Sequence, residues 1–585
     1  MTYRDLGIGR YISATPSKRF PVYTRGNAGE VYPEVFYPLG YSLAGQQGLK
    51  AFRRAIVRSG LMDAEEFVEE TGSSDDPVSI ATGVFGGYAY LNLSLNRVIA
   101  LRVPGGDLED LDRGLLGNAD IVPPHEVHPD DTNHKASARS LRFIWQTINA
   151  SDISHLDADK HEVELLIAER GDPARATDAS LYDTLTNFTD FGVRLFEAHL
   201  FTSMQASTAV TTLGRLCKDV LGDPDVAMQL LAGIGEVESA APAAELFRLG
   251  KLAASNPVVN AEFEAGLDGL EQRLKAHPES IAFLASFELF LAEHGSRGPN
   301  EWEVACHTWG TDLSLPLALI DRMRGASDDH DPQLQRSRLA EQRKRTVKEV
   351  RQKMGFGRRT IFDRALKAAS MFSQGRERSK TTVVRSIQIS RLAALELGRR
   401  IAERSDAAPD DIWYVVGEEL EAFIDDPAPF AEVIAERRAA RAELARRVPP
   451  FTFVGQIPSP DTWPLRDDQQ AVAVATGDEL SGVSGCPGKA VGVARVVLDP
   501  SDPGDLGPGD VLVAPLTDPS WTPLFVPAEA VVVDVGAQMS HAVIVSRELG
   551  IPCVVSVTDA TRRIPDGATI EVDGTTGKVT VISLP

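Results

Sequence analysis

The sequence is poor in cysteine and has no long apolar run. Its four cysteines, Cys217, Cys306, Cys486 and Cys553, are dispersed over 585 residues and form no Cys-x-x-Cys pair. This spacing supports neither a disulfide framework nor a zinc site, and we expect no bound metal. No apolar run approaches the length that spans a bilayer, and the first residues lack the apolar core of a signal peptide. These absences predict a cytoplasmic protein that has no membrane partner.

Positive charge is also scarce relative to negative charge. The chain has 60 Lys and Arg residues against 83 Asp and Glu residues, which gives a formal net charge of −23. Such an excess of negative charge argues against nucleic acid and against an anionic membrane surface as partners. The apolar content of 43% is ordinary for a globular protein. Because 585 residues exceed one compact core, we expect at least two domains.

The pattern along the chain predicts a multidomain fold. Residues 1–448 are predicted to form a large, mainly α-helical domain with some β structure near the N-terminus. Residues 449–480 are rich in proline and read as a linker or hinge, and residues 481–585 alternate strands and turns as a small α/β domain. Apolar residues at three- and four-residue spacing predict long helices over 179–204, 257–276, 280–294, 331–354, 382–404 and 428–447.

One histidine lies between an apolar strand and the first turn of a helix. The strand Ala530–Val535 ends at Gly536, and a helix is predicted from about Ala542 to Leu549, where Gly550 ends it. A side chain at this junction faces the unpaired amides and the positive end of the helix dipole, which favour a phosphoryl group. We therefore select His541 as the first candidate catalytic residue. The alternative is that His541 only caps a helix in an ordinary βα unit.

A second candidate cluster precedes the predicted helix 382–404. Arg376, Glu377 and Lys380 have spacings that present two cations and one carboxylate to the same point. This combination suits phosphoryl transfer, because the cations offset charge on the transferred group and the carboxylate accepts a hydroxyl proton. A solvated helix start is the alternative. The basic run 336–359 carries apolar residues on one helical face, which favours an amphipathic helix over a phosphate-binding strip.

Residues 481–585 contain several short sequence blocks that follow one another in the same order as in a known domain. They are Ser484–Gly492, Gly509–Pro515, Thr517–Leu524, Gly536–Pro552 and Val572–Val579. In this order they resemble the swivelling phosphohistidine domain of phosphoenolpyruvate synthase, pyruvate phosphate dikinase and rifampin phosphotransferase. The resemblance implies that His541 accepts a phosphoryl group and carries it between two distant sites.

The match has one departure near this histidine. Ala537 and Met539 replace residues of the dikinase pattern Gly-Gly-x-Thr, and the apolar Met539 is more similar to the rifampin phosphotransferase branch. Without the threonine of that pattern, the resemblance does not imply pyruvate as the acceptor.

The N-terminal part resembles the substrate domain of rifampin phosphotransferase. The similar blocks are 29–33, 294–301, 376–380, 410–414 and 418–420. The resemblance implies that Arg376, Glu377 and Lys380 lie by the acceptor as catalytic residues, with Arg297, Glu301 and Ser540 binding substrate. Ser296 replaces the family's histidine, which puts acid/base chemistry there in doubt, and Arg297 with Glu301 equally fits a structural ion pair.

No segment of the sequence resembles the family's ATP-grasp half, and there is no P-loop. The resemblance then implies a separate ATP-grasp subunit that binds most of the ATP and Mg²⁺, as in two-component aryl phosphate synthases such as that for 4-cresol. We expect an acceptor-and-carrier subunit that passes phosphate through His541 to a hydroxyl, with a phenol or alkylphenol as the small-molecule acceptor. The alternative is a phosphocarrier or regulatory protein that passes phosphate to another protein.

Overall fold

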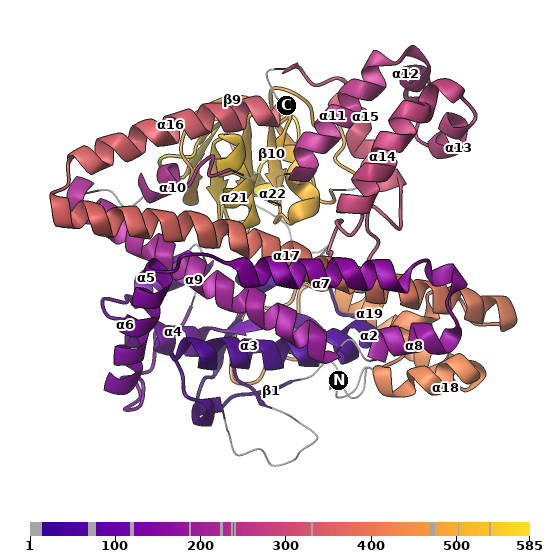
Figure 1. Cartoon of the computed structure of the whole chain (residues 1–585), viewed down its shortest axis with the longest axis horizontal. Coiled ribbons are helices and arrows are strands. Elements are labelled where there is room, and N and C mark those ends of the chain that lie inside the picture. Colours follow the sequence, from indigo (N-terminus) through magenta and orange to yellow (C-terminus); the bar gives the residue numbers. More distant parts are fainter. Residues whose placement is uncertain are drawn as a thin grey trace.

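The structure is a computed structural model, in which the chain is mainly helical (Figure 1). It describes residues 14–585 except 68–77, 117–121, 187–188, 223–225, 236–237, 239–240, 329–330, 467–473, 501 and 538–539. Short strands near the N-terminus and a C-terminal α/β region with a mixed sheet accompany the helices, which confirms the predicted fold class. Among the helices described, none has both the length and the apolar character needed to cross a membrane.

The large region is built from helices that pack on one very long helix, α17 (Phe356–Arg404). Its strongest packing is against α9 (Thr189–Leu221), where small side chains such as Ala206, Ala209 and Ala365 are fully buried. The other helices of residues 14–448 are α1 (Ala28–Val31), α2 (Pro38–Gly40), α3 (Gln46–Ser59), α4 (Leu93–Arg102), α5 (Leu108–Leu116), α6 (His134–Ile148), α7 (Ser154–Arg170), α8 (Asp178–Thr186), α10 (Val226–Leu230), α11 (Ala241–Ser255), α12 (Pro257–Glu264), α13 (Leu270–Lys275), α14 (Ile281–His294), α15 (Ser314–Arg324), α16 (Pro332–Gln352), α18 (Leu420–Asp425) and α19 (Ala431–Ala445).

Helix α17 corrects the predicted placement of the Arg376 cluster. The sequence predicted a helix over 382–404 with the cluster just before it, whereas Arg376, Glu377 and Lys380 lie in the middle of a continuous 49-residue helix. Gly375 lies within this continuous helix, although glycine disfavours a helix interior. It is needed for close packing: a Cβ there would lie 2.9 Å from Cδ1 of Ile153 and 3.1 Å from Cδ1 of Leu156.

The predicted helix 257–276 is also interrupted, between α12 and α13. Gly266 and Gly269 have φ values of 104° and 64°, a left-handed conformation that stops the helix. Helix α16 matches the predicted basic helix. Most of its residues are exposed or half-buried, while Val350 and the nearby Met354 are buried, as expected for an amphipathic helix.

A small antiparallel sheet joins the start of the chain to the end of the large region. Strands β4 (Thr82–Phe85), β5 (Tyr88–Asn92), β2 (Val22–Thr24) and β6 (Thr452–Val454) lie in this order. The rings of Tyr23 and Phe453 stack across β2 and β6 with centroids 5.2 Å apart. The predicted linker therefore begins as a paired strand, and its residues 467–473 lie outside the described residues. Two further short strands, β1 (Thr15–Pro16) and β3 (Val78–Ser79), pair in parallel.

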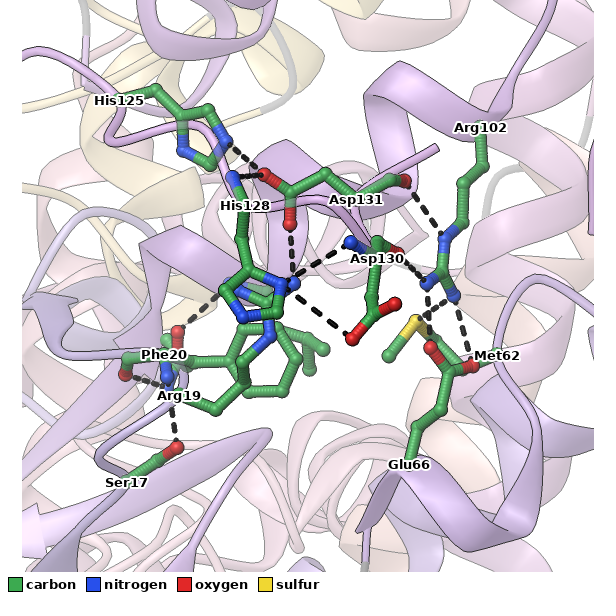
Figure 2. Close-up of polar contacts among 12 residues, drawn as sticks. Ser17, Arg19, Phe20, Met62, Glu66, Arg102, His125, His128, Asp130 and Asp131 are labelled. Atoms are coloured by element: carbon green, nitrogen blue, oxygen red, sulfur yellow. Dashed lines mark hydrogen bonds and ion pairs between the residues drawn. The ribbon is translucent and has the colours of Figure 1, made fainter. Parts of the chain in front are cut away.

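A buried arginine connects several segments of the N-terminal region through hydrogen bonds and ion pairs (Figure 2). The side chain of Arg102 is 1% exposed; it pairs with Glu66 and donates to the carbonyl oxygens of Asp130 and Asp131 at 2.9 and 3.2 Å. The carboxylate of Asp131 in turn pairs with Arg19 and lies 2.9 Å from Nε2 of His125. Each buried charge has a partner, as burial of charge requires.

The C-terminal domain is an eight-stranded sheet in the order β7-β14-β13-β9-β10-β11-β12-β8. Its strands are β7 (Glu479–Ser481), β8 (Val483–Cys486), β9 (Lys489–Val496), β10 (Asp510–Ala514), β11 (Ala530–Val533), β12 (Cys553–Val555), β13 (Thr569–Asp573) and β14 (Lys578–Ser583). The central strands β9 to β12 are parallel, and β10, β11 and β12 are buried throughout, which explains why every residue in them except Asp510 is apolar.

Helices α20 (Thr522–Phe525), α21 (His541–Leu549) and α22 (Ala560–Arg563) complete this domain. Because α21 follows β11, its N-terminus lies at the carboxyl edge of the parallel strands, where α/β folds bind ligands. In Figure 1, α16 and α17 extend on either side of the domain, and α21 lies between them. The domain core merges with that of α11, α14 and α15, so the two regions are in contact.

Two glycines of α17 give a stability test of this packing. A Cβ on Gly398 would lie 2.2 Å from the carbonyl oxygen of Pro409, whereas a Cβ on Gly357 would meet nothing within 4 Å. Gly398→Ala should therefore lower the free energy of unfolding by about 1–3 kcal/mol despite alanine's better helix propensity. The matched control Gly357→Ala should leave it unchanged or raise it by up to about 1 kcal/mol. Urea unfolding followed by circular dichroism measures both, and equal effects would contradict the packing described.

Candidate active site

Helix α21 presents its N-terminus to the large region. Ser540 is the N-cap residue with an extended backbone, His541 is the first helical residue, and Gly550 ends the helix with φ 70°. The structure thus agrees with the predicted helix to within one residue. The hydroxyl of Ser540 is buried and has no hydrogen-bond partner among the residues that the structure describes, and the nearby Ala537 is buried. Met539, the departure from the dikinase pattern, lies outside the described residues.

The ring of His541 is held by two threonines of its own domain. Its Nε2 lies 3.1 Å from Oγ1 of Thr522, and its Nδ1 lies 3.2 Å from Oγ1 of Thr517. The ring of Phe525 contacts it edge to face, with centroids 5.9 Å apart. Burial lowers the pKa of His541 well below its usual range, and the charges of Lys380, Arg297 and Arg376 lower the pKa further. The imidazole is therefore neutral near pH 7, with one ring nitrogen that donates to a threonine hydroxyl and one whose lone pair accepts from the other.

Four of the predicted residues converge opposite this ring. Glu301 lies between two cations: its Oε2 is 2.9 Å from Nε of Arg297, and its Oε1 is 3.4 Å from Nζ of Lys380. One turn earlier on α17, Nε of Arg376 lies 3.8 Å from Oε1 of Glu377. The structure thus brings Arg297, Glu301, Arg376 and Lys380 to the face of the large region that meets His541. Arg297 and Glu301 lie outside the helices, in the segment between α14 and α15, and form the ion pair that was one of the two interpretations of this block.

Three further groups at the site were not predicted as site residues. Glu30 accepts a hydrogen bond from the backbone N–H of His541 at 3.4 Å. Asp518 accepts from the backbone N–H of Asn300 at 3.2 Å, and burial raises its pKa. His199 lies on α9 with its Nδ1 3.1 Å from Oγ of Ser379. Glu30 and Asp518 fall in blocks that the resemblance had singled out, whereas no sequence signal distinguished His199 from other helical histidines.

A cavity lies between α21 and the middle of α17. It is lined by Val210, Ile234, Ser373, Arg376, Glu377, Ile544 and Arg547. Ile544 follows His541 by three residues, so both occupy neighbouring positions on one side of α21. The cavity is thus lined by Arg376 and Glu377 of α17 and, on α21, by both the apolar Ile544 and the charged Arg547. Ser296, in place of the expected histidine, is buried, and its hydroxyl has no hydrogen-bond partner.

The site holds no arrangement typical of a resident metal. Within the described ranges, no group of three or more His, Cys, Asp or Glu side chains is placed to hold a metal ion. Positive charge at the site comes instead from Arg297, Arg376 and Lys380. Buried guanidinium and ammonium groups are the side chains that stabilise a phosphoryl group without a metal.

Comparison with known proteins gives two family matches. Residues 198–377 match the fourth domain of rifampicin phosphotransferase, and residues 506–577 match the mobile domain of PEP-utilising enzymes. The second match contains His541, and the first ends at Glu377.

Three curated relatives illustrate the similarity to whole proteins. An uncharacterised protein of Mycobacterium tuberculosis is 42% identical over 211 residues, 36% of this chain and 23% of that protein. The prodigiosin synthesizing transferase PigC of Serratia marcescens is 26% identical over 580 residues, 96% of this chain and 63% of that protein. The rifampicin phosphotransferase of Streptomyces sviceus is 28% identical over 434 residues, 72% of this chain and 48% of that protein. The chain spans less than two thirds of the length of each.

The ion pair at Glu301 can be tested by removing the carboxylate. Glu301→Ala leaves Arg297 and Lys380 buried without their shared partner, so the free energy of unfolding should fall by about 3–5 kcal/mol. Glu288→Ala, at an exposed position of α14, is the control and should change it by less than about 0.5 kcal/mol. Urea unfolding measures the difference. A loss below about 1 kcal/mol for Glu301→Ala would show that the pair does not hold the site together.

The buried histidine His199 predicts a pH dependence of stability. Burial, followed by the charge of Arg376, lowers its pKa to about 3 from the ordinary 6.5. The unfolded chain therefore takes up the proton first, and stability falls as the pH decreases through 6.5 toward 3, by about 1.4 kcal/mol per pH unit.

Because other groups titrate in the same window, the test is a comparison between variants. Between pH 7.5 and 5.5, the wild-type chain should lose about 1.4 kcal/mol more stability than His199→Gln, which has no proton to gain. His161→Gln, at an exposed position, should lose as much as the wild type. Equal losses in the wild type and in His199→Gln would contradict the neutral, buried state of this ring.

Proposed function

Because the chain belongs to the PEP-utilising, rifampicin phosphotransferase-like family, we propose that His541 carries a phosphoryl group to a small-molecule hydroxyl. The observation that carries the proposal is the position of a neutral imidazole at the N-terminus of α21, opposite Arg376 and Lys380 of α17. A neutral ring is the nucleophilic form, and the helix amides with the cations stabilise the anion that forms on it.

The reaction proceeds in two balanced steps. A lone pair of a His541 ring nitrogen attacks phosphorus of the donor, an N–P bond forms, and the P–O bond to the leaving phosphate breaks. The acceptor oxygen then attacks the same phosphorus, the N–P bond breaks, and the hydroxyl proton passes to the carboxylate of Glu377. Arg376 and Lys380 offset the charge on the phosphoryl oxygens in both states, which is the main catalytic demand of phosphoryl transfer.

The cavity beside Glu377 supports the choice of acceptor. Val210, Ile234 and Ile544 give it apolar lining beside the polar Ser373, Arg376, Glu377 and Arg547, a combination that suits a hydroxyl on an apolar ring. A phenol or alkylphenol therefore remains our proposed acceptor, as in an aryl phosphate synthase. The names of the relatives point to different acceptors, since one denotes a rifampicin phosphotransferase and another a prodigiosin synthesizing transferase.

The phosphoryl donor in this proposal is ATP with Mg²⁺, bound mainly by a separate ATP-grasp subunit. The C-terminal domain would move on the predicted linker between that subunit and α17. A second candidate is a phosphocarrier that passes the group to another protein, and Ser296 in place of the family's histidine favours it.

The relay is tested by reconstitution. The chain, a candidate ATP-grasp subunit, ATP, Mg²⁺ and a panel of phenols should together yield an aryl phosphate and an acid-labile phosphohistidine. His541→Ala should abolish both, whereas His161→Ala, at an exposed position of α7, should change neither. Product formation by His541→Ala would remove this residue as the carrier. A phosphorylated chain that transfers to no phenol would favour the phosphocarrier instead.

The proposed base gives a separate prediction. Glu377→Gln should leave phosphorylation of His541 unchanged, because that step releases no acceptor proton, and should slow transfer to the phenol about 100-fold or more. Glu403→Gln lies on the same helix with its side chain 64% exposed, and it should transfer at the wild-type rate. Rapid-quench measurement of the two half-reactions distinguishes these outcomes. A slower first step with an unchanged second step would contradict the assignment.

A further inference from the structure

Helix α21 is capped by a residue from the other region of the chain. Its own N-cap residue, Ser540, makes no side-chain hydrogen bond to the helix, although serine commonly does so. Instead, Oε2 of Glu30 accepts a hydrogen bond from the backbone N–H of His541 at 3.4 Å. Glu30 belongs to the short helix α1, far away in sequence. The carboxylate thus connects the large region directly to the residue that carries the phosphoryl group in the proposed function.

The same cations act on the carboxylate and on the imidazole. The positive charges of Arg376 and Lys380 favour the charged form of Glu30 and disfavour the charged form of His541. Both cations are therefore close enough to interact electrostatically with both groups. The hydrogen bond from His541 and the charges of Arg376 and Lys380 lower the pKa of Glu30, but burial has the larger effect and raises it to about 7. We call the backbone N–H of His541 with the side chains of Arg376 and Lys380 the anion site. In the unmodified chain, the carboxyl group of Glu30 contacts this site through the N–H of His541 and is partly charged near neutral pH.

The charges around the anion site do not favour a second anion. Three cations, Arg297, Arg376 and Lys380, face four carboxyl groups, Glu30, Glu301, Glu377 and Asp518. A phosphoryl group adds between about one and a half and two negative charges. Glu301 is fixed between two cations, and Asp518 accepts backbone hydrogen bonds. Glu30, which contacts the anion site through one long hydrogen bond, is the carboxylate that can leave.

We propose that Glu30 is a positioning residue that holds the unloaded C-terminal domain against α17 and is displaced from the anion site when His541 is phosphorylated. The inference rests on the proposed function in assuming that His541 receives the phosphoryl group. The exchange makes and breaks no covalent bond, because one anion replaces another at the same donors. After transfer to the acceptor, Glu30 returns and blocks the site against the reverse reaction.

The first experiment uses the unmodified full-length chain and needs no phosphorylation. Amide hydrogen exchange in α21 should become about three- to tenfold faster in Glu30→Ala, because the helix loses its only charged cap. Glu30→Gln should show a smaller increase, since its amide oxygen still accepts the hydrogen bond. Glu34→Ala, at an exposed position in the same segment, is the matched control and should exchange like the wild type.

This comparison can overturn the proposal directly. Exchange in β13, a buried strand of the same domain, should remain unchanged in all variants and so excludes general unfolding. If α21 exchanges in Glu30→Ala and Glu30→Gln at the wild-type rate, Glu30 does not hold the domain. If Glu30→Ala does not fold, Glu30→Gln alone decides, because it keeps the size of the side chain.

The second experiment loads His541 with phosphoramidate, a reagent that phosphorylates histidine without a nucleotide. Small-angle X-ray scattering then gives the fraction of chains with the C-terminal domain in contact. Phosphorylation of His541 should lower the ratio of chains with the C-terminal domain in contact to chains with it detached. The decrease should be about tenfold larger in the wild type than in Glu30→Gln, because the glutamine carries no charge that the phosphoryl group could displace. Equal shifts in the two proteins would overturn the exchange. If phosphoramidate modifies other histidines but never His541, the proposed function fails, and the hydrogen exchange of the unmodified chain decides the role of Glu30.

Discussion

The structure depends on the contact between the positive end of α21 and the cations of α17. A histidine at that helix terminus would be an ordinary capping residue if it faced solvent. Here it is half-buried and faces Lys380, Arg297 and Arg376, and burial together with these charges lowers the pKa of its imidazole well below the usual range. The same charges that disfavour a proton on the ring favour a phosphoryl group on it. The proposed transfer therefore requires the C-terminal domain to be in contact with the large region.

The length of α17 makes this contact possible. One helix of 49 residues carries the cations at its centre, packs on α9 along one side, and extends along the C-terminal domain together with α16 (Figure 1). Glu301 then fixes the direction of Lys380 and Arg297 from a neighbouring turn. A rigid helix and a buried ion pair hold the charges in place before any ligand arrives, so little reorganisation accompanies the transfer.

Local sequence signals predicted the parts of the site, whereas long-range packing determined how the parts meet. The β-branched strand, Gly536 and Gly550 predicted the position of His541 and the extent of α21, because these signals act within a few residues. The continuous course of α17 through the Arg376 cluster was not predicted, and only contacts with Ile153 and Leu156 show why Gly375 is tolerated inside it. The pairing of β6 with β2 and the contact of Glu30 with His541 join residues more than 400 positions apart, and no local pattern encodes them.

The most direct test of the relay is single-turnover transfer from a chain already phosphorylated on His541. The decay of phosphohistidine and the appearance of aryl phosphate would be followed after addition of 4-cresol and related phenols. Lys380→Met should slow transfer about 100-fold, because it removes a cation from the phosphoryl oxygens. Arg378→Met, two residues earlier on α17 and paired with Asp157, should transfer at the wild-type rate. Transfer by Lys380→Met as fast as by the wild type would contradict the meeting of α21 and α17 as the site of chemistry.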